Sequence, residues 1–167
     1  NPERCGIQRN DNDSYTVTPG REIFPVNYVT WYAAQGFLAW AGLRLPTEAE
    51  FQKTLRGGLF LDGDETKKKP NPQPGRKYPW GDDPPNAGGV WRCNCDFDEN
   101  GTGKLARVGS YAQFSSPYGA CDLVGNVAEW TLDVYATSYH AGLDGYRMIR
   151  GGSYLDPAAG CDAIAGA

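Results

Sequence analysis

The segment Arg150-Gly151-Gly152-Ser153-Tyr154 is followed by Leu-Asp-Pro-Ala-Ala-Gly-Cys-Asp-Ala-Ile-Ala-Gly-Ala, which runs to residue 167. The double glycine predicts a rigid backbone turn, because glycine adopts conformations that other residues avoid. The residues after Tyr154 are small, of mixed polarity and without helical or strand periodicity. This contrast favours a scaffold that ends in a binding surface over a catalytic centre.

The composition predicts one packed domain across residues 1–167. Hydrophobic residues make up 40% of the chain and include 5 Trp, 10 Tyr and 6 Phe, which is typical of a globular core. The 22 Gly and 12 Pro predict many turns and few long elements. We expect residues 1–22, which are mostly polar, to form an irregular N-terminal segment.

The charge argues against a nucleic-acid partner. The formal net charge is −4, and the only cationic run, Lys67-Lys68-Lys69, lies in a Pro- and Asn-rich stretch typical of a solvated loop. The sequence shows no signal peptide and no apolar run long enough to span a bilayer, so we expect no transmembrane segment. The compartment stays open.

The cysteines do not form a recognisable metal motif. There are 5 of them, so at least one is unpaired within the chain. Cys93-x-Cys95 stands alone, and a single histidine, His140, cannot complete a zinc signature.

Two helices are predicted in the first third of the chain. Thr30 is suited to cap a helix over Trp31–Ala41, and Gly42 stands where a left-handed C-cap would end it. Before this helix, Tyr28-Val29 reads as a short extended piece. The mixture of two early helices with later short strands predicts the α+β class.

The second helix and one strand have clear end signals. Thr47 and Glu50 form a predicted capping box at the start of the helix, and Gly57-Gly58 ends it. Tyr146–Arg150 alternates enough in polarity to predict a strand that runs into the double glycine.

Six blocks of the sequence together resemble the formylglycine-generating enzyme, or sulfatase-modifying factor, superfamily. The blocks are Pro25–Trp31, Arg44–Phe51, Tyr78–Asp82, Val108–Ser110, Leu123–Trp130 and Arg150–Tyr154. The resemblance implies a divergent C-type lectin fold, in which two helices flank small, twisted antiparallel sheets.

The resemblance also implies where catalytic residues would lie. Copper-dependent members carry two cysteines, five residues apart, after the Gly-Gly-Ser-Tyr segment, and the matching positions here are Asp156 and Cys161. Copper(I) favours soft sulfur donors, so a carboxylate in place of one thiolate implies that the oxidase chemistry is lost. Cys161 is then either a buried structural thiol or a reactive one. We expect a protein that is not an enzyme; the alternative is a formylglycine-generating-type oxidase or its inactive relative.

Two segments carry oxygen ligands that would suit calcium. Asp96-x-Asp98-x-Asn100-Gly101 begins like an EF-hand loop, but Arg107 occupies the position of the bidentate glutamate. A calcium site of another kind and an Asx-turn both remain open for this loop.

The second segment follows from the resemblance. It implies a calcium site built from the carboxylates of Asp122 and Glu129 and the backbone carbonyls of Gly125 and Val127. In the alternative, the two carboxylates only brace the turn. We expect no required cofactor and at most a structural calcium ion.

One branch of the superfamily consists of variable proteins diversified by retroelements. Its members lack the catalytic cysteines and carry hypervariable positions just after the double glycine. The resemblance implies that residues 151–167 form the variable region and bind a protein or other macromolecule on a cell or phage surface. The expected ligand-binding residues are Tyr154, Leu155, Asp156, Pro157, Ala158, Ala159, Gly160, Asp162, Ile164 and Gly166.

Two alternatives stay open beside this hypothesis. Residues 155–167 could be a frayed end without a function. The protein could also be an accessory domain that contacts partners through the aromatic loops at Tyr78–Trp80 and Trp91.

Overall fold

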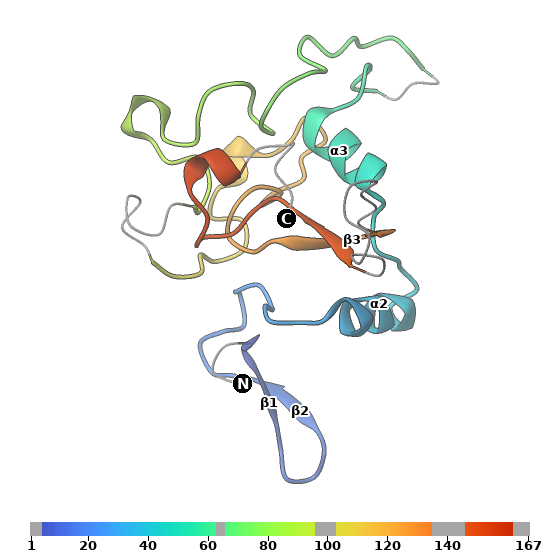
Figure 1. Ribbon diagram of the computed structural model, residues 1–167, viewed down its shortest axis with the longest axis vertical. Helices are drawn as coiled ribbons and strands as arrows, with labels where there is room; N and C mark the ends of the chain where they lie inside the picture. The colour runs from blue at the N-terminus through green and yellow to red at the C-terminus, as the bar shows by residue number, and fades with distance from the viewer. Residues whose placement is uncertain (1–4, 63–65, 96–102, 135–145, 162–167) are drawn as a thin grey trace.

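The computed structural model describes residues 5–62, 66–95, 103–134 and 146–161. Within these ranges it contains two α-helices and two small antiparallel sheets joined by long loops (Figure 1). Three short 3-10 turns lie in the loops, at Ala87–Gly89, Ala112–Phe114 and Ala158–Gly160. The expected α+β class is confirmed. No helix in the described ranges is long and apolar enough to cross a bilayer.

Helix α2, Trp31–Trp40, begins where the sequence predicts and ends one residue earlier than predicted. The Thr30 hydroxyl accepts a hydrogen bond from the Ala33 backbone N–H, and Gly42 has a φ of 72° just beyond the helix. Trp31 is its one buried side chain. The helix contains no charged residue, so it presents an uncharged and mostly apolar face to its surroundings.

Helix α3, Glu48–Arg56, begins with the predicted capping box. The Thr47 hydroxyl accepts a hydrogen bond from the Glu50 N–H at 3.2 Å, and the Glu50 carboxylate accepts one from the Thr47 N–H at 2.8 Å. Gly57 then ends the helix with a φ of 89°. These local signals fix both ends, because each satisfies backbone groups that the helix leaves unpaired.

Residues 5–22 contain regular structure, which corrects the expectation that residues 1–22 form an irregular segment. Strand β1, Ile7–Arg9, pairs antiparallel with strand β2, Tyr15–Val17. The polar run between them is a turn, in which the Asn10 N–H donates to the Ser14 carbonyl at 2.8 Å. Every residue of β2 is exposed, so the hairpin lacks the alternation of apolar and polar residues that marks a half-buried strand.

The second sheet pairs strand β3, Glu129–Val134, with strand β4, Arg147–Arg150. Glu129 lies opposite Arg150, and an irregularity in register follows Trp130. The predicted strand at the double glycine is therefore confirmed to within one residue.

Strands β3 and β4 hold both helices. The Trp31 indole N–H donates to the Thr131 carbonyl at 2.8 Å. At the start of α3, the Glu48 backbone N–H donates to the Asp133 carboxylate at 2.6 Å, where a negative charge complements the helix dipole. The Glu48 side chain in turn forms a half-buried ion pair with Arg150 at 2.6 Å.

The hydrophobic core lies between α3 and the loops that follow it. Its buried residues are Phe51, Leu55, Tyr78, Cys93, Cys95, Leu123, Val124 and Cys161. Trp80, Trp91, Ala120 and Ala158 pack against this cluster from its edge. Six of these eight residues lie outside the helices and strands, so the loops contribute more to the core than the regular elements do.

Asn126 joins three loops beneath the double glycine. Its side-chain Oδ1 accepts hydrogen bonds from Asn94 Nδ2 at 3.1 Å and from the Ala106 N–H at 2.9 Å. Its backbone N–H donates to the Asn94 carbonyl at 2.7 Å, and its carbonyl accepts from the Tyr154 N–H at 3.1 Å. Asn126 is only 3% exposed, so these bonds replace the water that the buried amide has lost.

Two glycines allow the backbones to approach at this point. Gly125 has a φ of 75°, and a Cβ atom there would lie 2.5 Å from the Asn94 carbonyl oxygen. Gly151 has a φ of 88°, and its Cβ would lie 2.7 Å from the Leu123 carbonyl oxygen. The Gly125 N–H donates to the Gly151 carbonyl at 2.7 Å, which joins the two segments directly.

We expect Gly125→Ala to lower the free energy of unfolding by at least about 3 kcal/mol, because it adds a backbone clash to an unfavourable φ. Gly119→Ala is the matched control: Gly119 has a φ of 81° and open space around its missing Cβ. The control should cost only about 1–2 kcal/mol for the left-handed conformation. Urea denaturation of both variants measures the difference, and equal losses would contradict the close approach.

Candidate functional site

The segment after the double glycine is held at both ends. The Asp156 carboxylate accepts hydrogen bonds from the Ser153 backbone N–H at 2.7 Å and from the Ser153 hydroxyl at 2.8 Å. Cys161 is 0% exposed, and a Cβ atom on Gly152 would lie 2.7 Å from its sulfur. The seven residues between Ser153 and Cys161 therefore form a loop with fixed ends.

Burial alternates along this loop. Leu155 is 55% exposed, and Pro157 and Ala159 are also exposed. Asp156 and Ala158 are half-buried, and Ala158 packs against the core cluster. Among the described residues, the outward part of the expected surface thus consists of every second side chain.

The other expected ligand-binding residues differ in position. Tyr154 and Gly160 are half-buried, and Tyr154 is tied to the scaffold through its backbone N–H. Asp162, Ile164 and Gly166 lie outside the described residues. A ligand-binding role for the whole set stays a prediction.

A groove of about 410 Å³ begins beside this loop. One wall is the segment that leads into α2, and the other consists of the turn before β3, Trp130, Ile149 and the start of the loop. The lining residues are Val26, Asn27, Tyr28, Val29, Asn126, Val127, Ala128, Trp130, Ile149, Ser153, Tyr154 and Leu155. Its volume lies within the range of roughly 300–1,000 Å³ typical of ligand pockets.

The wall before α2 was not among the predicted site residues. Tyr28 was expected to be extended, but it has a φ of 56°, which places it in the left-handed region. The sequence offered one unused signal, since Val26, Tyr28 and Val29 are apolar residues outside any predicted helix. All three are exposed, at 47%, 62% and 39%.

The two carboxylates of the predicted calcium site, Asp122 and Glu129, interact electrostatically. Burial first, and the neighbouring Asp122 carboxylate second, raise the pKa of Glu129 to about 7. Two neighbouring carboxylates form a donor pair whose charge a calcium ion would neutralise. Asp122 Oδ2 also accepts a hydrogen bond from the Gly109 N–H at 2.6 Å, so it braces the turn as well.

Two of the predicted calcium ligands line different pockets. Val127 lines the groove described above, whereas Asp122 lines a different and smaller pocket. The described residues contain no group of three or more His, Cys, Asp or Glu side chains that could hold a metal ion. The loop with Asp96, Asp98 and Asn100 lies outside the described residues. Calcium binding at Asp122, Gly125, Val127 and Glu129 therefore stays a prediction.

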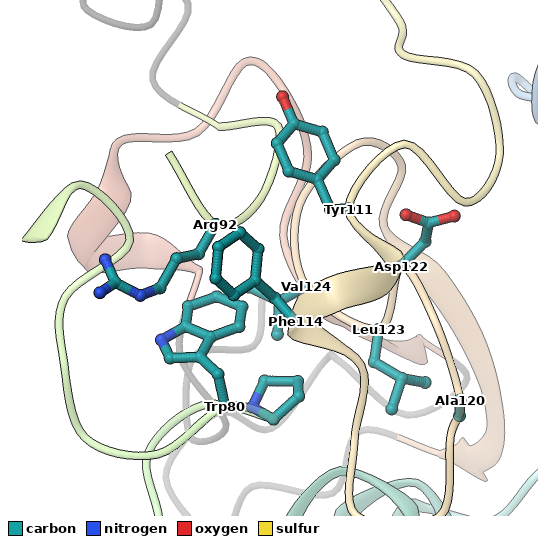
Figure 2. Close-up of a pocket in the computed structure, with 9 residues that line it drawn as sticks. Trp80, Arg92, Tyr111, Phe114, Ala120, Asp122, Leu123 and Val124 are labelled. Atoms are coloured by element: carbon teal, nitrogen blue, oxygen red, sulfur yellow. The ribbon is translucent and has the colours of Figure 1, made fainter. Parts of the chain in front are cut away.

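The smaller pocket is a feature of packing. It encloses about 10 Å³, roughly the space that one water molecule needs. Figure 2 shows the rings of Trp80 and Phe114 beside the Arg92 side chain. The Trp80 ring also stacks on Tyr78, with ring centres 5.0 Å apart.

These aromatics serve the core. Tyr78 is 7% exposed, and Trp80 and Trp91 pack against the core cluster. An accessory domain that contacts partners through these residues would need them on the surface. Tyr78 is too buried for such contacts, whereas Trp80 and Trp91 are partly exposed, so for these two that alternative stays open.

The two positions that match the catalytic cysteines both take part in holding the loop. Cys161 is fully buried, and the Asp156 carboxylate is engaged by Ser153. Cys93 and Cys95 lie elsewhere in the core with their sulfurs 3.5 Å apart, which is too far for a disulfide bond.

A model of the sulfatase-modifying factor enzyme 1-like domain matches residues 4–166. The formylglycine-generating enzyme of Streptomyces coelicolor is 36% identical over 154 residues, which cover 81% of this chain and 44% of that protein. The inactive C-alpha-formylglycine-generating enzyme 2 of Bos taurus is 37% identical and covers 82% of this chain and 40% of that protein. The chain thus spans less than half the length of these two relatives, one of which is an enzyme and one of which is inactive.

A solved structure shows the same fold at lower identity. Treponema denticola variable protein 1 superimposes with a TM-score of 0.64 and 20% identity, over 99% of this chain and 73% of that chain. This agreement confirms the lectin-like architecture that the six sequence blocks predicted.

We expect Glu129→Gln to remove a pH dependence of stability. The folded-state pKa of about 7 lies above the ordinary value of 4.5, so the folded protein binds the proton more tightly than the unfolded chain. Stability should fall as the pH rises from about 4.5 to about 7 and stay lower above that. With EDTA present, the variant should match the wild type at pH 5 and exceed it by up to about 3 kcal/mol at pH 8. Urea denaturation at both pH values measures this, and a variant less stable at pH 8 would contradict it.

Added calcium tests the predicted metal site in the same assay. At pH 8 we expect 5 mM CaCl₂, roughly an excess over the affinity of extracellular sites, to stabilise the wild type. Glu129→Gln should show little or no gain. Equal gains in both proteins would remove Glu129 from the ligand set.

Proposed function

The chain belongs to the sulfatase-modifying factor enzyme 1-like family, and we propose that it is a non-catalytic ligand-binding protein. Its binding surface would be the loop that follows Gly151-Gly152. We further propose that it is a variable protein of the kind diversified by retroelements. Its ligand would be a protein or other macromolecule on a cell or phage surface.

The observation that carries this proposal is the division of the loop into fixed and free positions. Ser153, Asp156 and Cys161 hold the backbone through hydrogen bonds and burial. Leu155 and Pro157 point away from the core, so substitution there does not disturb packing. A rigid frame with tolerant outward positions is how binding loops combine variation with a stable fold.

The chemistry of the matching catalytic positions supports the absence of catalysis. A copper(I) centre would need two thiolates that are accessible to oxygen and substrate, and this chain supplies one thiol and one carboxylate. That thiol, Cys161, lies in the core. A calcium ion held by Asp122 and Glu129 would serve the structure rather than a reaction.

The second candidate is an oxidase of the formylglycine-generating type. The 36% identity to the Streptomyces coelicolor enzyme favours it, because that protein catalyses the family's reaction. The Bos taurus relative of similar identity is described as inactive, so identity at this level does not decide between the two.

A pair of randomised libraries tests the binding proposal without knowledge of the ligand. In the first, Leu155, Pro157 and Ala159 are randomised in yeast-displayed protein. In the second, matched exposed residues of the same types are randomised: Leu59, Pro72 and Ala112. Both are panned against lysozyme and against streptavidin.

We expect the first library to yield binders at least about tenfold more often, because its three positions lie together on one fixed loop. Surface display of unselected clones should be equal in the two libraries, since none of the six side chains is buried. Equal frequencies of binders in the two libraries would contradict the proposal.

Turnover of a sulfatase-derived peptide with copper(I) and oxygen tests the second candidate. We expect no formylglycine above background in a mass-spectrometric assay, with or without Cys161→Ser. Product formation that disappears in Cys161→Ser would make the protein an enzyme.

A further inference from the structure

The groove beside the loop has no charged residue in its lining. Its walls carry the side chains of three valines, one isoleucine, one leucine and three aromatic residues. An ion placed there would lose its hydration without gaining a partner, whereas an apolar group would gain by leaving water. The lining therefore selects an uncharged, largely apolar occupant.

The two walls are fixed relative to one another. The Trp130 indole N–H donates to the Val29 carbonyl at 3.0 Å, which joins β3 to the segment before α2. On the other side, the Tyr154 N–H bonds to Asn126. The groove is thus a preformed feature of the scaffold, and a ligand need not order it.

Tyr28 occupies a costly conformation at the rim. Its φ of 56° is uncommon for a bulky residue and costs roughly 1–2 kcal/mol. The side chain is nevertheless 62% exposed, so burial does not compensate for this cost. Strained backbone at an exposed aromatic residue is typical of a position kept for binding.

Asn27 supplies a polar group next to this rim. Its side-chain Oδ1 is buried and accepts no hydrogen bond from the described residues. Asn27 itself lines the groove. A neutral N–H donor, such as a peptide group, would satisfy this acceptor.

We infer that this groove receives an uncharged aromatic or branched aliphatic side chain of a protein partner. The inference rests on the proposed function and assigns the source of its binding energy. Pro157 and Ala159 are too small to supply much contact area, whereas hot spots are usually aromatic. The scaffold residues Tyr28 and Trp130 provide the anchor, and Leu155 extends the same lining into the loop.

Capped amino acids serve as probes of the groove. N-acetyl-phenylalaninamide and N-acetyl-leucinamide are neutral, and N-acetyl-lysinamide is the charged control. The NMR signal of the Trp130 indole N–H reports on binding, because this group bridges the two walls. We expect saturable shifts with both neutral probes and affinity at least about tenfold weaker for the lysine probe.

Two substitutions of Tyr28 separate binding from folding. Tyr28→Ala and Tyr28→Gly should each lower the affinity for N-acetyl-phenylalaninamide by at least about tenfold. Tyr28→Gly should leave the urea midpoint unchanged or raise it, because glycine adopts a φ of 56° without strain. Tyr15→Ala, which removes an exposed tyrosine in the β1–β2 hairpin, should leave probe affinity unchanged.

Three results would overturn the inference. They are the absence of a saturable Trp130 shift with either neutral probe, equal affinity for the lysine probe, and full affinity in Tyr28→Ala. A dimer that Tyr28→Ala dissociates would instead assign the groove to a second copy of the chain.

The library experiment keeps this inference distinct from the proposed function. Loop-dependent binders without probe binding would leave the proposed function standing and remove the groove from it. Probe binding without loop-dependent binders would support the groove as a site and overturn the proposed function.

Discussion

The structure depends on the contact between two backbone segments that leave no room for side chains. Gly125 lies against the Asn94 peptide, Gly151 lies against the Leu123 carbonyl, and the two glycines share a hydrogen bond. The Asn126 side chain then accepts hydrogen bonds from Asn94 and Ala106 in the loops around it. Strand β3 begins shortly after this contact and β4 ends directly before it. The contact therefore also positions the two strands that hold both helices.

The same contact gives the candidate site its geometry. The loop after the double glycine is held at its start by the hydrogen bond from the Tyr154 N–H to the Asn126 carbonyl, and at its end by the buried Cys161. The described part of the chain, which has two short sheets, therefore presents a well-defined backbone at its surface. By the resemblance, this chain departs from the copper-dependent members at one of their two cysteine positions, where Asp156 stands. One fold can carry different side chains, and hence different functions, at the same backbone positions.

The sequence predicted what depends on neighbouring residues and missed what depends on distant ones. The helix ends at Thr30 and Thr47 followed from capping chemistry, which acts over three residues. The β1–β2 hairpin was missed because its strands are short and exposed. The groove could not be foreseen, because the Trp130 bond to Val29 joins residues 101 positions apart. The burial alternation after Tyr154 likewise arises from contacts with the core rather than from a local pattern.

The buried sulfur under Gly152 has a consequence for how such a loop can evolve. Ser153 and Cys161 are both held in place, so the chain between them must span a fixed distance. An added or deleted residue would displace one of the two from its contacts. Change in this loop is therefore confined to replacement of side chains at constant length. Related proteins would differ in the residues of this loop but not in its length, whereas antibody loops vary in both.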